Sequence, residues 1–190
     1  IFLVRQGLEK LLDFPIKEFP IHARKGLKNL WSSSVMLLDC SQLNHWNLAN
    51  FIKQMHAGSL DYDDLMYLKL EEKKIGELEA KWNDFDIIKD NTILLHTTEK
   101  ITQPWRTGLK LNSLIPPLFN IFPRAPIYKL FGKNLTIGRE HPQKTVTKFF
   151  MKELQDCLRE GVITHQELDQ AIKDNFVRPD IYIGLKKNYS

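Results

Sequence analysis

The stretch that decides the fold is SSSVMLLDC, residues 32–40. Three serines lead into a four-residue apolar run, Val35 to Leu38, which has the length of a buried strand. A second apolar run, TILLH at residues 92–96, predicts another buried strand that ends at His96. Together with the helical segments around them, these strands predict an α/β fold with a few strands from a mixed sheet.

Segments with apolar residues at helical spacing precede and separate the two strands. Three leucines predict a helix within residues 5–14. The apolar positions from Trp46 to Met55 predict a second helix, capped by Ser41 or Asn44 and closed by Gly58. Asp61 is the expected cap of a further short helix, and residues 87–88 suggest a short strand.

The last third of the chain is predicted to be helical. Residues 101–143 are rich in Pro, Gly and Asn, which indicates a long ordered loop of the kind that is often functional. An apolar stripe over residues 145–160 predicts a helix that ends at Gly161, and the capping box from Thr164 to Glu167 opens another. We therefore expect two parts, residues 1–143 and a C-terminal helical hairpin over residues 144–190 that packs on them.

Composition narrows the class of protein. The chain has 190 residues, 43% hydrophobic and 26% charged, as in ordinary globular domains. No run approaches the roughly 18 apolar residues of a membrane-spanning helix. Two cysteines, Cys40 and Cys157, are too few for a disulfide framework or a zinc cluster, so a reducing cytoplasm is the expected compartment. The chain begins at Ile1 with an apolar segment that lacks the features of a signal peptide, which suggests a piece of a longer protein.

Charge is distributed unevenly. Residues 61–90 carry ten acidic and five basic side chains, whereas residues 91–152 carry ten basic and two acidic ones, a net charge of +8. A basic block of this kind can face nucleic acid, anionic lipid at a membrane surface or a phosphorylated small molecule, or it can simply be a solvated face. Because no ribonucleoprotein-type motif accompanies it, we expect no specific nucleic-acid partner.

His96 is the first candidate for chemistry. Ligands of open α/β sheets bind beyond the carboxyl ends of strands, where this histidine is expected. A neutral imidazole there can bind a divalent metal ion, and the basic and hydroxyl residues that follow can reach phosphate oxygens. The alternative is a structural histidine that is held by a hydrogen bond.

Other candidates have equally plain structural alternatives. Trp82 and Asn83 lie in an acidic turn that can hold a loop or orient a sugar hydroxyl, and the serines at 32–34 can admit a ligand or form a strand-entry turn. Asp63 and Asp64 can act on a substrate or favour a helix dipole. The sequence contains no Walker loop, dinucleotide fingerprint, zinc-protease motif or nucleophile elbow.

The order of these segments is more informative than any one of them. In sequence they are SSVMLLDC, YDDLM, IGEL with Trp-Asn, LHTT and QPWRTGL. This order resembles the C-terminal half of nucleotide-sugar-dependent glycosyltransferases of the GT-A fold, in the style of glycogenin and the bacterial lipopolysaccharide galactosyltransferases. It is most similar to uncharacterised bacterial members of the nucleotide-diphospho-sugar transferase superfamily, over about residues 30–185.

The resemblance implies roles for individual residues. His96 corresponds to the strand-end histidine that completes a Mn²⁺ or Mg²⁺ site, and Pro104 and Trp105 correspond to the Pro-Trp that follows it. Ser33 and Ser34 match a segment near the donor sugar, and Asp63 or Asp64 lies near the family's sugar-binding acid. The remaining implied contacts to the nucleotide-sugar donor are Trp82, Asn83, Lys100, Gln103 and Arg106.

The sequence also departs from that family. Gln103 stands where the relatives have a lysine that touches the donor diphosphate, and Lys100 or Arg106 would have to supply that charge. The upstream Asp-x-Asp of the metal site is missing, and we interpret the triplet at residues 84–86 as incidental. We expect a glycosyltransferase whose acceptor is a glycan or a small molecule. This piece alone is expected to be inactive. We expect no transmembrane segment, although the protein can still contact a membrane surface peripherally.

Two other classes of protein remain open. One is a basic module that binds nucleic acid or another anionic ligand, and the other is a non-catalytic domain that keeps the fold. If strands that precede this piece complete the sheet, residues 1–4 and 34–38 should expose an apolar edge.

Overall fold

The computed structural model describes residues 1–16, 18–26, 29–111 and 137–187. The chain divides into two compact units, Ile1–His96 and Thr97–Ser190. This division falls well before the boundary at residue 143 that the sequence suggested.

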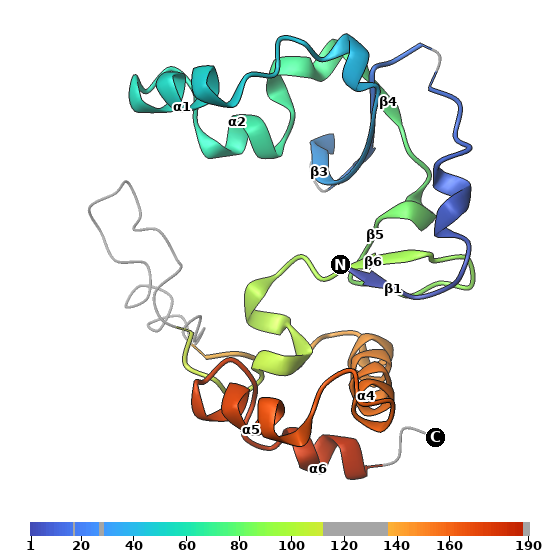
Figure 1. The fold of residues 1–190 in the computed structure, drawn as a ribbon, viewed down its shortest axis with the longest axis vertical. Helices are drawn as coiled ribbons and strands as arrows, with labels where there is room; N and C mark the ends of the chain where they lie inside the picture. The colour runs from blue at the N-terminus through green and yellow to red at the C-terminus, as the bar shows by residue number, and fades with distance from the viewer. Residues whose placement is uncertain (17, 27–28, 112–136, 188–190) are drawn as a thin grey trace. The chain divides into compact units, whose positions relative to one another are not determined.

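The first unit contains a small mixed sheet of β1 (Phe2–Leu3), β5 (Asp84–Phe85) and β6 (Leu94–His96). The strand order is β1-β6-β5, with β1 antiparallel and β5 parallel to β6 (Figure 1). The apolar residues packed beside it are Leu11, Leu78, Trp82, Ile93 and Leu94. The predicted strand at residues 92–96 is confirmed, whereas the strand at 87–88 does not form, because β5 ends at Phe85.

A second sheet in this unit contains β2 (Ile21–Lys25), β3 (Trp31–Leu38) and β4 (Ile75–Glu77). β2 lies in the centre, antiparallel to β3 and parallel to β4. Its core comprises Ile21, Ala23, Trp31, Leu43, Leu68 and Ile75. The serine-led strand is therefore real but longer than expected, and residues 32–38 are half-buried instead of buried. The reason is its position at the edge of the sheet, where β2 is its one partner strand among the described residues.

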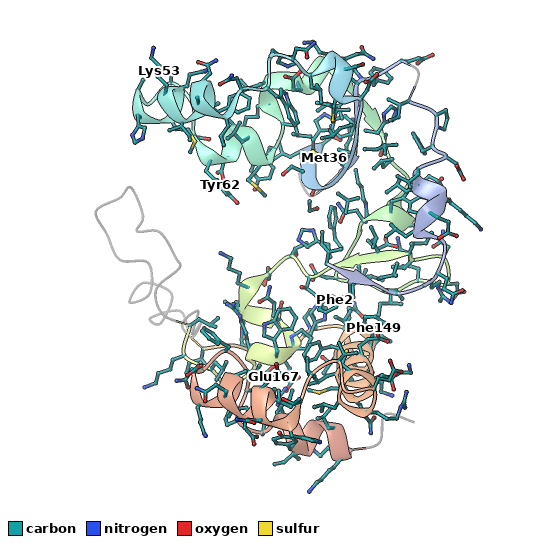
Figure 2. The ribbon with its side chains drawn as sticks, viewed as in Figure 1. Phe2, Met36, Lys53, Tyr62, Phe149 and Glu167 are labelled. Carbon is teal, nitrogen blue, oxygen red and sulfur yellow. The ribbon has the colours of Figure 1, made fainter. Side chains whose placement is uncertain are left out.

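The helices of the first unit are short. The helix expected within residues 5–14 is a single 3-10 turn, Leu8–Leu11. α1 (Leu48–His56) is capped by Asn47 and not by Ser41 or Asn44, because the Asn47 side chain accepts the backbone N–H of Asn50. α2 (Tyr62–Met66) is capped by Asp61 as predicted. Figure 2 labels Lys53 on α1 and Tyr62 on α2, and the Tyr62 side chain is largely exposed.

The second unit is mainly helical. Two 3-10 turns, Lys100–Thr102 and Pro104–Arg106, precede α4 (Lys144–Arg159), α5 (His165–Lys173) and α6 (Ile181–Lys186). The predicted hairpin of α4 and α5 is confirmed, with Gly161 at φ 70° and a complete capping box at Thr164. α6 packs against this pair through the core residues Met151, Leu168 and Ile181 (Figure 1). Most of the loop expected over residues 101–143 lies outside the described residues.

The α/β class is thus confirmed, with small mixed sheets in the first unit. An exposed apolar edge is present at β1, which lies at the edge of its sheet with Ile1 and Leu3 56% and 50% exposed. Residues 34–38 also belong to an edge strand, β3, but they are half-buried. Cys40 and Cys157 are both free thiols. Within the described ranges, no helix combines the length and apolar character needed to cross a membrane.

Candidate functional site

His96 ends β6, and the parallel pairing with β5 places it opposite Phe85. Its imidazole meets the Phe85 ring edge-on, with ring centroids 5.8 Å apart. The backbone N–H of Asp86 donates to the His96 carbonyl at 3.0 Å, so the residue that follows β5 lies beside the end of β6. This is the carboxyl edge of two parallel strands, the place where α/β sheets bind ligands.

The His96 side chain is half-buried, and its Nδ1 is buried without a hydrogen-bond partner among the described residues. Burial lowers the pKa of His96, and the Asp86 carboxylate opposes that shift without reversing it. The imidazole is therefore neutral at physiological pH, which is the form that binds a metal ion. The described residues contain no group of three or more His, Cys, Asp or Glu side chains that could hold a metal ion.

A buried polar cluster lies beside Phe85. The Arg24 guanidinium stacks 4.3 Å from the centre of the Phe85 ring and donates to the carbonyl of Asn83. It also reaches the carboxylate of Asp84 at 3.3 Å. Asp84 is 1% exposed and accepts two further hydrogen bonds, from Lys89 Nζ at 2.9 Å and Thr92 Oγ1 at 2.6 Å. The Asp84 carboxylate is thus held by three side chains of this unit.

Asn83 and Ser34 meet in the same region. Asn83 is fully buried, and its Nδ2 donates to Ser34 Oγ at 2.8 Å. Ser34 Oγ in turn lies 2.7 Å from Ser32 Oγ. Asn83 Oδ1 and the neighbouring Trp82 Nε1 are buried with no partner in the described parts of the chain. Two sequence candidates 49 positions apart are therefore in direct contact, and one of them keeps an unused acceptor.

Ser33 and Asp64 come together in a mainly apolar pocket of about 210 Å³. Asp64 completes the cap of α2, and Lys69 donates to it at 2.7 Å. The hydrogen bond from Lys69 is the main reason that the pKa of Asp64 lies below its usual range, so this carboxylate is ionised. Asp63 is exposed and lies outside this pocket.

Glu71 lines the same pocket, and sequence reasoning missed it. Its side chain is almost completely buried and accepts hydrogen bonds from His45 Nε2 and, at 3.1 Å, Trp46 Nε1. Burial would raise the pKa of Glu71, but these two donors and the charge of nearby Lys74 together outweigh it and lower that pKa. The run EEKK at residues 71–74 is typical of an exposed charged turn, so no sequence signal marked one of its members as buried.

The other candidates belong to the second unit. Trp105 packs against Phe150 of α4 with ring centroids 5.3 Å apart, and its carbonyl accepts the backbone N–H of Arg178 at 2.8 Å. Gln103 Oε1 is buried and without a partner in the described part of the chain. Lys100 is exposed and Arg106 is half-buried.

Comparison of the chain with protein-family models, with curated proteins and with solved structures finds no match.

Proposed function

We propose that this chain is part of a nucleotide-sugar-dependent glycosyltransferase of the GT-A type, which transfers a sugar from a nucleotide-diphospho-sugar donor to a glycan or small-molecule acceptor. The proposal starts from the order of motifs along the chain. The observation that carries it is the buried Nδ1 of His96, which has no partner among the described residues and belongs to a neutral imidazole at the carboxyl edge of β5 and β6. A structural histidine is held through one or both ring nitrogens, and Nδ1 of His96 is free of such a bond among the described residues.

Two further observations support the proposal. The resemblance assigns Ser34 and Asn83 to the donor site, and these side chains are hydrogen-bonded to each other. It also assigns Ser33 and Asp64 to the sugar, and both line one pocket. Each pair brings together residues that are far apart in the sequence, and the two pairs lie at separate places, because Ser33 lines the pocket with Asp64 whereas Ser34 does not.

The chemistry assigns a task to each group. His96 would hold a divalent cation, which supplies positive charge to the departing nucleoside diphosphate. Asp64, already ionised, would accept a hydrogen bond from a sugar hydroxyl.

The test uses the protein that contains this chain. It is incubated with UDP-, GDP- and ADP-linked sugars, with Mn²⁺ or with EDTA, and the released nucleoside diphosphate is measured. We expect turnover that depends on Mn²⁺, and we expect His96→Ala to abolish it with little change in the thermal stability of the metal-free protein. His56→Ala, which changes an exposed histidine of α1, is the matched control and should keep full turnover.

Two results would contradict this proposal. Turnover that survives His96→Ala while only the unfolding temperature falls would make His96 a structural residue. No turnover with any donor, together with tight and strongly salt-dependent binding of polyanions, would favour the rival basic module.

A further inference from the structure

The pocket that Ser33 and Asp64 line in the first unit has a mainly apolar wall. Its volume of about 210 Å³ is large for a protein interior, where few voids exceed the size of a water molecule. The apolar side chains of the wall come from β3, α1, α2 and neighbouring segments, and they are Met36, Trp46, Phe51, Leu65, Leu68 and Leu70. Figure 2 labels Met36 on β3. Leu70 is 53% exposed, so the wall extends to the surface of the unit.

Glu71 holds one part of this wall in place. It is only 4% exposed, and its Oε1 accepts hydrogen bonds from His45 Nε2 and Trp46 Nε1. Lys74 Nζ lies 3.6 Å from the Oε2 atom of the same carboxylate. The bond to Nε1 restrains the Trp46 indole and uses its one polar atom, because an indole has a single donor and no acceptor. Trp46 therefore contributes an apolar ring to the pocket.

The other two polar residues of the wall are also bonded within the unit. Asp64 accepts hydrogen bonds from Lys69 at 2.7 Å and from the backbone N–H of Asp61 at 2.9 Å. Ser33 Oγ donates to the Met66 sulfur at 3.6 Å. A buried water molecule needs about two to four polar partners, and the polar groups of this wall are already engaged. The pocket therefore favours an apolar ligand over water.

The composition of the wall favours an aromatic ring over an aliphatic chain. Trp46 and Phe51 can each pack against a ring, stacked or edge-on, and such pairs are stabilised beyond the burial of their surface. The thioether of Met36 also makes favourable contacts with aromatic rings. An apolar cavity of about 150 Å³ is enough to bind benzene. The volume of about 210 Å³ therefore fits one substituted ring or two fused rings.

We propose that this pocket binds a small neutral aromatic molecule of one or two fused rings. The ring packs against Trp46, Phe51 and Met36. A sugar in its place would leave most of its hydroxyl groups without partners, which is costly. The Asp64 side chain is 26% exposed, so a sugar can contact it from outside the pocket. The binding of the aromatic molecule does not depend on the proposed transferase activity.

The experiment measures binding of indole to the full chain, with D-glucose as a polar molecule of similar size. The NMR signal of the Met36 methyl group should move saturably with indole, because a bound ring shifts the signals of the atoms that it contacts. The methyl signal of Met55, an exposed residue of α1 outside the pocket, is the internal control and should stay in place. We expect a dissociation constant of about 1 mM or below for indole and no saturable shift with glucose.

Two variants test the place of binding. Ser33→Leu puts an apolar side chain into the space of the ring and should weaken indole binding at least about tenfold. Phe51→Ser removes one aromatic side of the wall and should weaken it about fivefold, because apolar contact is lost. The matched control is Ile52→Ser, which changes the next residue of the same helix. Ile52 is 46% exposed and lies outside the pocket, so indole binding should not change.

Urea unfolding without indole guards against a misfolded variant. Ser33→Leu should leave the free energy of unfolding unchanged or raise it, since filling a cavity commonly stabilises a protein. If this variant fails to fold, the comparison of Phe51→Ser with Ile52→Ser decides, because both place a serine in the same helix.

Three results would overturn the proposal. Indole may cause no saturable shift of the Met36 signal, glucose may shift that signal as indole does, or Ile52→Ser may weaken binding as much as Phe51→Ser. Turnover of a nucleotide sugar is measured without indole, and indole binding is measured without a nucleotide sugar. This proposal and the proposed function can therefore fail separately.

Discussion

Asn83 Nδ2 donates a hydrogen bond to Ser34 Oγ at 2.8 Å, which joins the turn after Trp82 to the edge strand β3. The contact connects the two sheets of the first unit, because Asn83 directly precedes β5 and Ser34 lies within β3. It also explains why a fully buried amide is tolerated there, since one end of it is paired. The amide oxygen Oδ1 at the other end of the side chain has no hydrogen-bond partner among the described residues.

The first prediction concerns this hydrogen bond. Asn83→Ala should lower the free energy of unfolding by about 1–3 kcal/mol, because it removes a buried bond and leaves a void. Ser34→Ala should cost about 1 kcal/mol. Urea unfolding of the two variants and of the double variant gives the coupling energy, which should be clearly different from zero. Asn44→Ala, at an exposed position, is the control. Fully additive losses would mean that the two side chains do not interact.

The second prediction concerns the Asp84 carboxylate. Asp84→Asn removes a buried charge that Arg24 and Lys89 both contact, and the loss should be about 3 kcal/mol of unfolding free energy. The effect should change little between 0.05 and 0.5 M salt, because buried pairs are weakly screened. Asp90→Asn changes a nearby exposed carboxylate and should cost less than about 0.5 kcal/mol. Similar losses in the two variants would contradict the structural role of Asp84.

The third prediction concerns pH. His22 is buried against Phe14 and Phe19, and burial lowers its pKa below the ordinary value of about 6.5. Below that value the unfolded chain takes up a proton that the folded chain does not, so the free energy of unfolding falls as the pH falls. The loss begins near pH 6.5 and ends at the lower pKa of the folded state.

Urea midpoints between pH 7.5 and pH 5 measure this slope. His22→Gln should flatten it, and His96→Gln should do so too, because burial lowers the pKa of His96 in the same direction. His56→Gln, on the exposed side of α1, should leave the slope unchanged. A slope that is equal in all four proteins would show that neither buried histidine is responsible.

Sequence reasoning succeeded where local physics decides the structure. The helix cap at Asp61, the capping box at Thr164 and the turn at Gly161 depend on neighbours within a few residues, and all three are confirmed. It placed the strand at Val35 to Leu38 correctly but expected it to be buried, because whether a strand is buried or at an edge depends on which distant strands pair with it. The sequence also did not predict that the strands form two sheets, because strand pairing is likewise decided by residues far apart in the chain.

The candidate site shows the same difference between features that neighbours in the sequence decide and features that distant residues decide. The sequence named Ser34, Asn83 and His96 as separate candidates, but only the folded chain shows that Ser34 contacts Asn83. Glu71 was missed because a 3-10 turn rotates one member of a charged run toward Trp46.

The last prediction concerns Gly76, which pairs with His22 between β4 and β2. A Cβ at this position would lie 2.5 Å from the Cδ2 and Nε2 atoms of His22 and 3.0 Å from Phe19. Gly76→Ala should therefore lower the free energy of unfolding by about 1–3 kcal/mol, the usual cost of overpacking. The matched control is Gly26→Ala, whose Cβ would lie no closer than 3.4 Å to Phe85. It should cost less than Gly76→Ala.

Rescue by a second substitution tests the cause. His22→Ala removes the ring that the new methyl group would meet, so the double variant should lose clearly less stability than the sum of the two single losses. The coupling should be of the order of 1 kcal/mol in urea unfolding. If the losses add, or if Gly26→Ala costs as much as Gly76→Ala, the close approach of His22 to Gly76 is not what requires a glycine there. If the rescue succeeds, it also fixes the register of β2 against β4, because only this register places residue 76 beside residue 22.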